Sequence, residues 1–138
     1  MLGKKIGEEN GKVTGTRIIP GTDNKFVKME TSFQSQITLY GIKGSNIGTY
    51  VSYGRGGGQI YSEGSGIIVT TTGDGLIWNG HGVAQMTGKG MGVKVAFSIA
   101  IQTDSKKLAG LNNILVIGEH ETDEKGNAHS TLWEWKPA

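Results

Sequence analysis

The sequence predicts an all-β protein whose eight antiparallel strands follow one another as a meander and close into a barrel. Three observations lead to this prediction. Apolar and polar residues alternate with a period of two in eight segments, as in strands that bury one face. Glycine accounts for 24 of the 138 residues and marks the short connections between these segments. No long helical pattern separates the segments, which argues against a parallel α/β sheet.

Each predicted strand ends at a turn signal or runs into the next element. "PGTDN" ends the first strand, and "RGGG", "GDG", "GKGMG" and "EKGN" mark later turns. The segment 104–113, "DSKKLAGLNN", is the only helix-like piece. Asp104 or Ser105 is its N-cap and Gly110 its end, which gives a short helical turn before the last hairpin. The expected strands are 12–19, 25–40, 46–54, 59–71, 76–87, 93–103, 114–123 and 128–136.

The whole chain, 1–138, is expected to form a single domain, because its length is ordinary for one core. The clearest alternation is in 93–103, "VKVAFSIAIQT", where valine, phenylalanine and isoleucine occupy one face. Closure into a barrel removes the exposed strand edges that an open sheet would leave. A two-sheet sandwich is the alternative, and the meander order with glycines inside strands favours the barrel.

The stretch 63–82, "EGSGIIVTTTGDGLIWNGHG", has a Gly-x-Gly at each end. A phosphate-binding glycine loop needs a helix directly after it, and neither segment is followed by one. If "TGDG" forms a hairpin, the two Gly-x-Gly segments become neighbours on adjacent strands. Glycines there allow a barrel wall to bend, or leave room for bulky side chains opposite. We therefore interpret these glycines as structural.

Composition excludes several classes of function. The chain has no cysteine, which excludes disulfides, thiolate metal sites and a cysteine nucleophile. The net charge is +2, and the only adjacent basic pairs are 4–5 and 106–107, so no nucleic-acid partner is expected. No apolar run suits a signal peptide or a membrane span. A cytoplasmic protein without a membrane partner is the expectation.

Tryptophans are the main candidates for a ligand site. The face of the last hairpin that carries Trp133 and Trp135 is the more apolar one, so we expect it to point inward. With a four-residue turn, this face would include both His120 and His129. Trp78 and Met86 are expected to fill the barrel opposite the glycines. The predicted ligand-binding residues are Trp78, Trp133, Trp135 and His120.

Acid–base chemistry has several candidate residues. His120 and His129 at one barrel mouth could move a proton near neutral pH, but two ligands are too few for a metal site. With the faces reversed, Glu119 and Glu134 would lie inside and act as general acid or base. His81 has Glu63 as a partner on the neighbouring strand. The candidate catalytic residues are Glu63, His81, Glu119 and His120, and no metal or cofactor is predicted.

Two further sequence features concern anion binding and hydrolysis. Arg55 near Tyr50 and Tyr53 could receive a carboxylate ligand. No serine lies in the G-x-S-x-G context between a strand and a helix, so a hydrolase is not supported.

The layout resembles the allene oxide cyclase-like β-barrels, and in particular their uncharacterised prokaryotic members. The resemblance rests on 107–136, "KLAGLNNILVIGEHETDEKGNAHSTLWEWK", and on "GKVTGTRII" at 11–19. It implies a barrel with a small apolar cavity and a homo-oligomer. The plant cyclases bind an unsaturated fatty-acid epoxide, and we transfer none of their catalytic residues to this chain.

The leading functional hypothesis is a barrel that binds an apolar or amphipathic small molecule. The alternatives are an isomerase or cyclase-like enzyme and a structural module without a ligand. We also expect a homo-oligomer, more readily a dimer than a trimer, because two-fold pairs are the commonest closed assembly. The expected contact is the small, weakly charged outward row of the strand 93–103: Lys94, Ala96, Ser98, Ala100 and Gln102.

Overall fold

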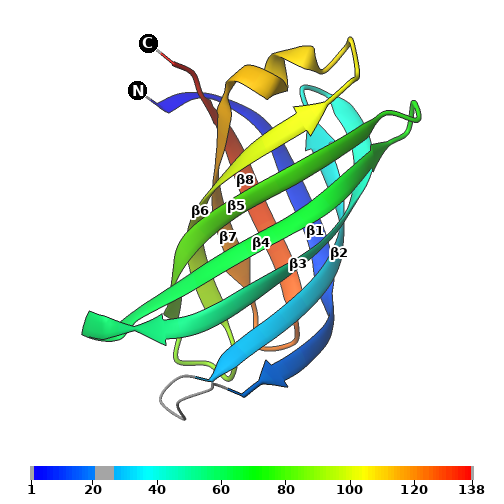
Figure 1. The fold of residues 1–138 in the computed structure, drawn as a ribbon. Coiled ribbons are helices and arrows are strands. Elements are labelled where there is room, and N and C mark those ends of the chain that lie inside the picture. The colour runs from blue at the N-terminus through cyan, green and yellow to red at the C-terminus, as the bar shows by residue number, and fades with distance from the viewer. Residues whose placement is uncertain (1, 21–26, 138) are drawn as a thin grey trace.

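A computed structural model describes residues 2–20 and 27–137 and shows eight antiparallel strands closed into a barrel (Figure 1). Each strand pairs with the next along the chain, and the last pairs with the first. The predicted fold class and meander order are confirmed. The predicted turn at 21–24 and the start of the second predicted strand, 25–26, lie outside the described residues. The strands are β1 (Leu2–Ile19), β2 (Lys28–Leu39), β3 (Ile42–Arg55), β4 (Gln59–Thr70), β5 (Gly75–Met86), β6 (Val93–Thr103), β7 (Leu115–Thr122) and β8 (Asn127–Trp135).

The first strand begins at Leu2, well before the predicted start at residue 12. Its first half pairs with both β2 and β8, with irregular register on either side of Lys5. Ile6 and Glu9 are buried there, whereas Lys5 and Glu8 are exposed. Two inward residues among many charged ones give no visible period, which explains why the sequence pattern did not reveal this part of β1.

Two 3₁₀ turns are the only helical elements in residues 2–20 and 27–137: η1 (Gly56–Gly58) and η2 (Ala109–Asn113). The predicted helical turn before the last hairpin is therefore present, but shorter than 104–113. Figure 1 places η2 at the end of the barrel near the two chain termini. Leu108 and Leu111 are buried beneath it. In the described part of the chain, no helix is long and apolar enough to cross a membrane.

The predicted glycine pairing across the β4–β5 hairpin is confirmed. Gly64 lies opposite Gly80, and Gly66 lies opposite Trp78. A Cβ added at Gly66 would lie 2.5 Å from the Trp78 indole, and one added at Gly48 would also lie 2.5 Å from it. Both distances are far below van der Waals contact, so these positions must lack a side chain for the indole to lie inside the barrel.

The last hairpin has a different register from the predicted one. The Asp123 amide donates to the Asn127 carbonyl oxygen over 2.9 Å, which leaves a three-residue loop that ends at Gly126 with φ of 83°. This loop is one residue shorter than the predicted turn. His120 therefore lies opposite Ser130. A slip of one residue moves every side chain of a strand to its other face, and this is what happens to β8.

The tightly packed core occupies the η2 end of the barrel. Leu76 and Leu111 there are fully buried, and Ile68 is 1% exposed. Inward side chains nearer the other end are smaller or polar, such as Ser62 on β4 and Ser130 on β8. The barrel is therefore filled at one end, which leaves room for a cavity farther along its axis.

The outward row of β6 is exposed at Lys94, Ala96, Ala100 and Gln102, as its alternation requires. A more apolar outer feature runs across β3, β4 and β5. Ile47 pairs with Ile67, which pairs with Ile77, and these three are 53%, 46% and 54% exposed. Association of two copies through an outer face stays a prediction.

Candidate functional site

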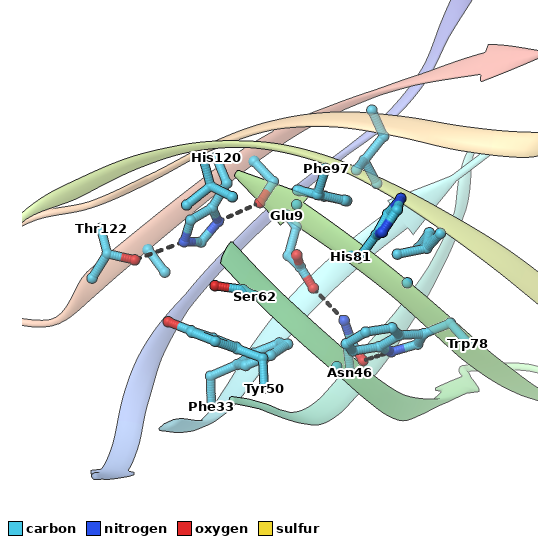
Figure 2. A pocket seen from close by; sticks show the side chains of 18 of the residues that line it. Glu9, Phe33, Asn46, Tyr50, Ser62, Trp78, His81, Phe97, His120 and Thr122 are labelled. Carbon is cyan, nitrogen blue, oxygen red and sulfur yellow. Dashed lines mark hydrogen bonds between the residues drawn. The ribbon is translucent and has the colours of Figure 1, made fainter. Parts of the chain in front are cut away.

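The barrel contains an internal cavity of about 110 Å³. Figure 2 shows side chains from strands all around the barrel converging on it. Most of the wall is apolar, and a few polar side chains interrupt it. The apolar side chains are Val13, Phe33, Ile37, Trp78, Val95, Phe97, Ile99, Ala128 and Leu132; the polar ones are Glu9, Asn46, Tyr50, Ser62, Glu63, His81, His120, Thr122 and Ser130.

Glycines of the wall make room for the aromatic rings that line the cavity. Phe33 and Trp78 lie stacked, with ring centroids 6.2 Å apart. On the other side, a Cβ at Gly118 would lie 2.0 Å from the Phe97 ring. An eight-stranded barrel is narrow. It can hold several aromatic rings and still keep space beside them only if some inward positions are glycines, which have no side chain.

A chain of hydrogen bonds fixes one side of the cavity. Trp78 Nε1 donates to Asn46 Oδ1 over 2.8 Å, and Asn46 Nδ2 donates to Glu9 Oε2 over 2.5 Å (Figure 2). Ser35 Oγ donates to the same Glu9 oxygen. Trp78, Asn46, Ser35 and Glu9 are all buried and come from four different strands. The position of each of these four side chains is therefore set by a different strand of the barrel.

His120 forms a second polar group in the cavity wall. Its Nδ1 lies 2.7 Å from Ser130 Oγ, and its Nε2 lies 2.6 Å from Thr122 Oγ1. Burial, with a smaller contribution from the charge of His129, lowers the pKa of His120 to about 4. The imidazole is therefore neutral at pH 7, and each of its nitrogens has a hydroxyl partner that can donate or accept.

We expect the burial of His120 to make stability depend on pH. The unfolded chain binds a proton on this histidine below about pH 6.5, whereas the folded protein does so only below about pH 4. The free energy of unfolding should therefore fall as the pH drops from about 6.5 to 4, by up to about 3 kcal/mol from this residue. Urea unfolding at several pH values, compared with H120Q, measures this. An equal slope in both proteins over this range would contradict it.

Tyr50 closes the cavity beside Phe33, with ring centroids 6.0 Å apart. Burial raises the pKa of Tyr50, and the neighbouring Thr31 partly offsets this through a hydrogen bond. The phenol therefore stays protonated near neutral pH and can donate a hydrogen bond inside the barrel. Nearby, the hydroxyls of Ser52 and Ser62 lie 2.7 Å apart.

Two of the predicted ligand-site residues line the cavity and two do not. Trp78 and His120 lie in its wall. Trp133 and Trp135 are on the outer face, and Trp135 is 44% exposed. Their predicted inward orientation is wrong because the shorter β7–β8 loop turns Ser130, Leu132 and Glu134 inward instead. Met86, another predicted occupant, is exposed at the end of β5.

Three predicted catalytic residues have exposed positions on the barrel wall. Glu63 and His81 pair across β4 and β5, and both are exposed. Both are among the residues that border the cavity, and His81 Nδ1 lies 3.1 Å from the Tyr61 hydroxyl. Glu119 on β7 is also exposed. Their exposure gives no support to an inward acid–base role, and catalysis by these three residues stays a prediction.

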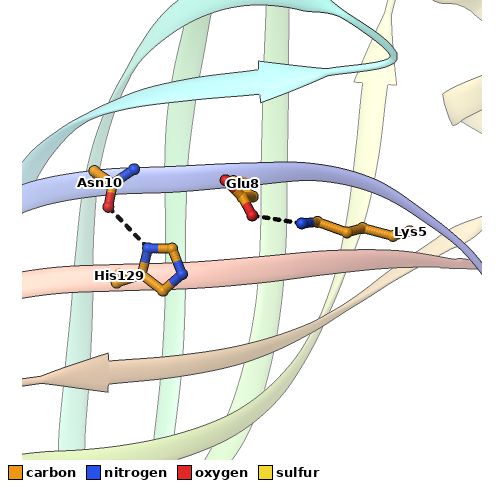
Figure 3. Close-up of polar contacts among 4 residues, drawn as sticks. All are labelled: Lys5, Glu8, Asn10 and His129. Carbon is orange, nitrogen blue, oxygen red and sulfur yellow. Dashed lines mark hydrogen bonds and ion pairs between the residues drawn. The ribbon is translucent and has the colours of Figure 1, made fainter.

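The predicted pairing of His120 with His129 is also wrong. His129 lies on the outer face, where its Nδ1 is 2.8 Å from Asn10 Oδ1 (Figure 3). In the same figure Lys5 contacts Glu8 and holds the pKa of that carboxyl below its usual value. Within residues 2–20 and 27–137, no three His, Asp or Glu side chains lie close enough together to hold a metal ion.

Glu134 has the opposite orientation from the one first expected. It is buried and accepts a hydrogen bond of 2.8 Å from the Tyr40 hydroxyl. This bond holds the pKa of Glu134 below its usual value, while burial together with Glu134 raises the pKa of Tyr40 to about 12. Because Tyr40 lies in the two-residue β2–β3 turn, the contact ties that turn to β8. The hydrogen bond between Tyr40 and Glu134 lies outside the cavity and has a structural role.

The polar residues that sequence reasoning missed are Glu9, Ser35 and Asn46. Asn46 has a recognisable signal, because it alternates with Gly48 and Tyr50 in β3. Ser35 likewise lies between Phe33 and Ile37 on the predicted inward face of β2. Glu9 has no such signal, since it lies in the strongly polar first half of β1. The sequence did point to Tyr50, but as a neighbour of Arg55 in a site for a carboxylate ligand. Arg55 is exposed.

No protein-family model matches the sequence, and no similar sequence is found among curated proteins. Solved structures share the fold. A conserved protein of unknown function from Rhodopseudomonas palustris has a TM-score of 0.81 at 12% identity, over 97% of both chains. A β-barrel-like protein from Acinetobacter baumannii has a TM-score of 0.80 at 10% identity, over 97% of this chain and 94% of the other.

An enzyme from Penicillium herquei is similar with a TM-score of 0.67 at 18% identity, over 95% of this chain and 92% of that one. At these identities the similarity shows a common eight-stranded barrel fold and nothing of activity.

Proposed function

We propose that this protein binds a compact, predominantly apolar small molecule inside its barrel. The observation that carries the proposal is the internal cavity of about 110 Å³, with an apolar wall and a few fixed polar groups. Ligand sites have this composition, with polar groups that orient the ligand and apolar surface that binds it. A place among the allene oxide cyclase-like barrels is part of this proposal, and the barrel neighbours support it at the level of fold.

The size of the cavity limits the ligand. Typical pockets for drug-sized ligands measure roughly 300–1,000 Å³, whereas an engineered apolar cavity of about 150 Å³ holds benzene. A volume of about 110 Å³ therefore favours a ligand of the size of a single ring. A long fatty chain like that of the plant cyclase substrates would need the barrel to open.

Filling the cavity should abolish binding. Ala128 lines the cavity, and Ala100 lies exposed on the outer face of β6. We expect toluene to bind the wild-type protein and A100L with equal affinity, and A128L at least ten times more weakly. Backbone amide shifts in an NMR titration measure the affinities, and thermal unfolding shows that both variants fold. Absence of toluene binding to the wild-type protein, or equal affinity for both variants, would contradict the proposal.

An acid–base isomerase is a second candidate function. It is favoured by one specific arrangement: Glu9, Ser130 and His120 lie in one row on neighbouring strands, all turned inward. A carboxylate can remove a proton from carbon, and a neutral histidine can relay protons through hydroxyls. Such an enzyme should exchange the α-hydrogens of cyclohexanone with deuterium oxide, and E9Q should not. If cyclohexanone exchanges its α-hydrogens no faster with the protein than in buffer alone, the isomerase function is wrong and the binding function stands.

A further inference from the structure

Glu9 is a buried carboxyl that has no cationic partner among the described residues. The ion pairs among the described residues join Lys5 to Glu8, Arg17 to Glu30 and Lys136 to Glu134. The cavity lining includes neither lysine nor arginine. A buried acidic side chain is usually paired, because removing it from water costs free energy. Within the described part of the chain, no lysine or arginine therefore neutralises Glu9.

The hydrogen-bond chain fixes what Glu9 can accept. The indole nitrogen of Trp78 can only donate, so Asn46 must present its Oδ1 to Trp78 and its Nδ2 to Glu9. Glu9 Oε2 thus acts as an acceptor, and it also accepts from Ser35. Both of these bonds go to Oε2, and Glu9 is one of the residues that line the cavity. Its second oxygen, Oε1, is therefore the acceptor that we assign to a ligand.

The remaining polar groups do not attract an anion. His120 is neutral at pH 7, and both of its nitrogens already have hydroxyl partners. Tyr50 and Ser62 offer neutral hydroxyls. A ligand carboxylate would meet the Glu9 carboxyl in a wall that, among the described residues, includes neither lysine nor arginine. Like charges at short range in a low dielectric repel strongly.

We propose that the cavity selects ligands whose polar group donates hydrogen bonds to Glu9 Oε1, with compact primary amines bound best, alcohols next and carboxylates not at all. This inference rests on the proposed function and names the chemical class of its ligand. A protonated amine would form a charge-assisted hydrogen bond, which is about twice as strong as a neutral one. The apolar wall then accommodates the ring.

Four probes of nearly equal size test the selection: benzylamine, benzyl alcohol, benzoate and toluene. At pH 7 we expect benzylamine to bind the wild-type protein at least ten times more tightly than toluene. Benzyl alcohol should be intermediate, and benzoate should show no saturable binding. NMR titrations provide all four affinities under the same conditions.

Two neighbouring glutamates provide matched variants. E9Q removes the carboxyl from the cavity wall, and E8Q removes one from the outer face of the same strand, where Glu8 contacts Lys5. E9Q should bring the affinity for benzylamine to within threefold of that for toluene, and E8Q should leave the wild-type order unchanged.

The outcomes separate the two proposals. The selection by Glu9 is wrong if toluene binds and benzylamine binds no more tightly than toluene. It is also wrong if E9Q retains the preference for the amine. In both cases the binding function stands. If none of the four probes binds, both are wrong. Should E9Q fail to fold, the order of amine and carboxylate in the wild-type protein decides the inference alone.

Discussion

Replacing Gly7 by alanine is expected to destabilise the protein by about 3 kcal/mol or more, near the upper end for overpacking. The added Cβ would lie 1.8 Å from the Thr38 carbonyl oxygen of β2. That atom belongs to the backbone, so no side-chain rotation relieves the overlap. β1 would have to separate from β2 around the Gly7–Leu39 pair. We expect a fall in Tm of roughly 10 °C.

Gly15 on the same strand is the matched control. Nothing lies within 4 Å of a Cβ added there. G15A should leave Tm unchanged or raise it slightly, because alanine restricts the unfolded chain more than glycine does. Differential scanning calorimetry of G7A and G15A makes the comparison. Equal Tm values for the two variants would show that β1 and β2 do not approach each other as described.

Truncating Trp78 to alanine should cost about 3–5 kcal/mol of unfolding free energy, as for other buried large aromatic residues. The change removes a buried indole that stacks on Phe33, and it leaves Asn46 Oδ1 without its donor. The orientation of Asn46 would then no longer be fixed, so the contact with Glu9 should weaken as well. Urea unfolding measures the loss.

Trp135 offers the opposite expectation for the same substitution. Its side chain is 44% exposed on the outer face of β8. W135A should therefore cost below about 1 kcal/mol, as is usual for surface positions. A loss comparable to that of W78A would mean that Trp135 points inward and that the register of the last hairpin is the one first predicted.

The strand order and most inward faces could be predicted because they depend on local patterns. Alternation in β6 and the turn glycines between β4 and β5 are each readable within a few residues. The pairing of Gly64 with Gly80 followed from the position of one turn. These features needed no knowledge of distant contacts.

The face of β8 could not be predicted, because it depends on the length of a single loop. Both faces of this strand carry large apolar residues: Leu132 on one and Trp133 on the other. Their hydrophobicity gives no clear choice, and the larger tryptophans favoured the wrong face. The backbone bond between Asp123 and Asn127 decides the register, and a loop one residue longer would have reversed it.

The candidate site was only partly predictable for a related reason. Trp78 and His120 lie on strands with clear alternation, and their inward orientation could be expected. Glu9 lies among exposed charges, and burial of a glutamate runs against its ordinary preference. Its position becomes intelligible only once Ser35 and Asn46, from two other strands, are seen to donate to it.

A crystal structure of the protein under xenon pressure tests directly whether the barrel interior can hold a small molecule. Xenon enters apolar cavities of this size without needing any polar contact. We expect a xenon atom inside the barrel among Phe33, Trp78 and Phe97, next to the hydrogen-bonded Glu9 and Asn46. A barrel interior closed by side chains, with no xenon among these three rings, would contradict the claim that this barrel is built to hold a small molecule.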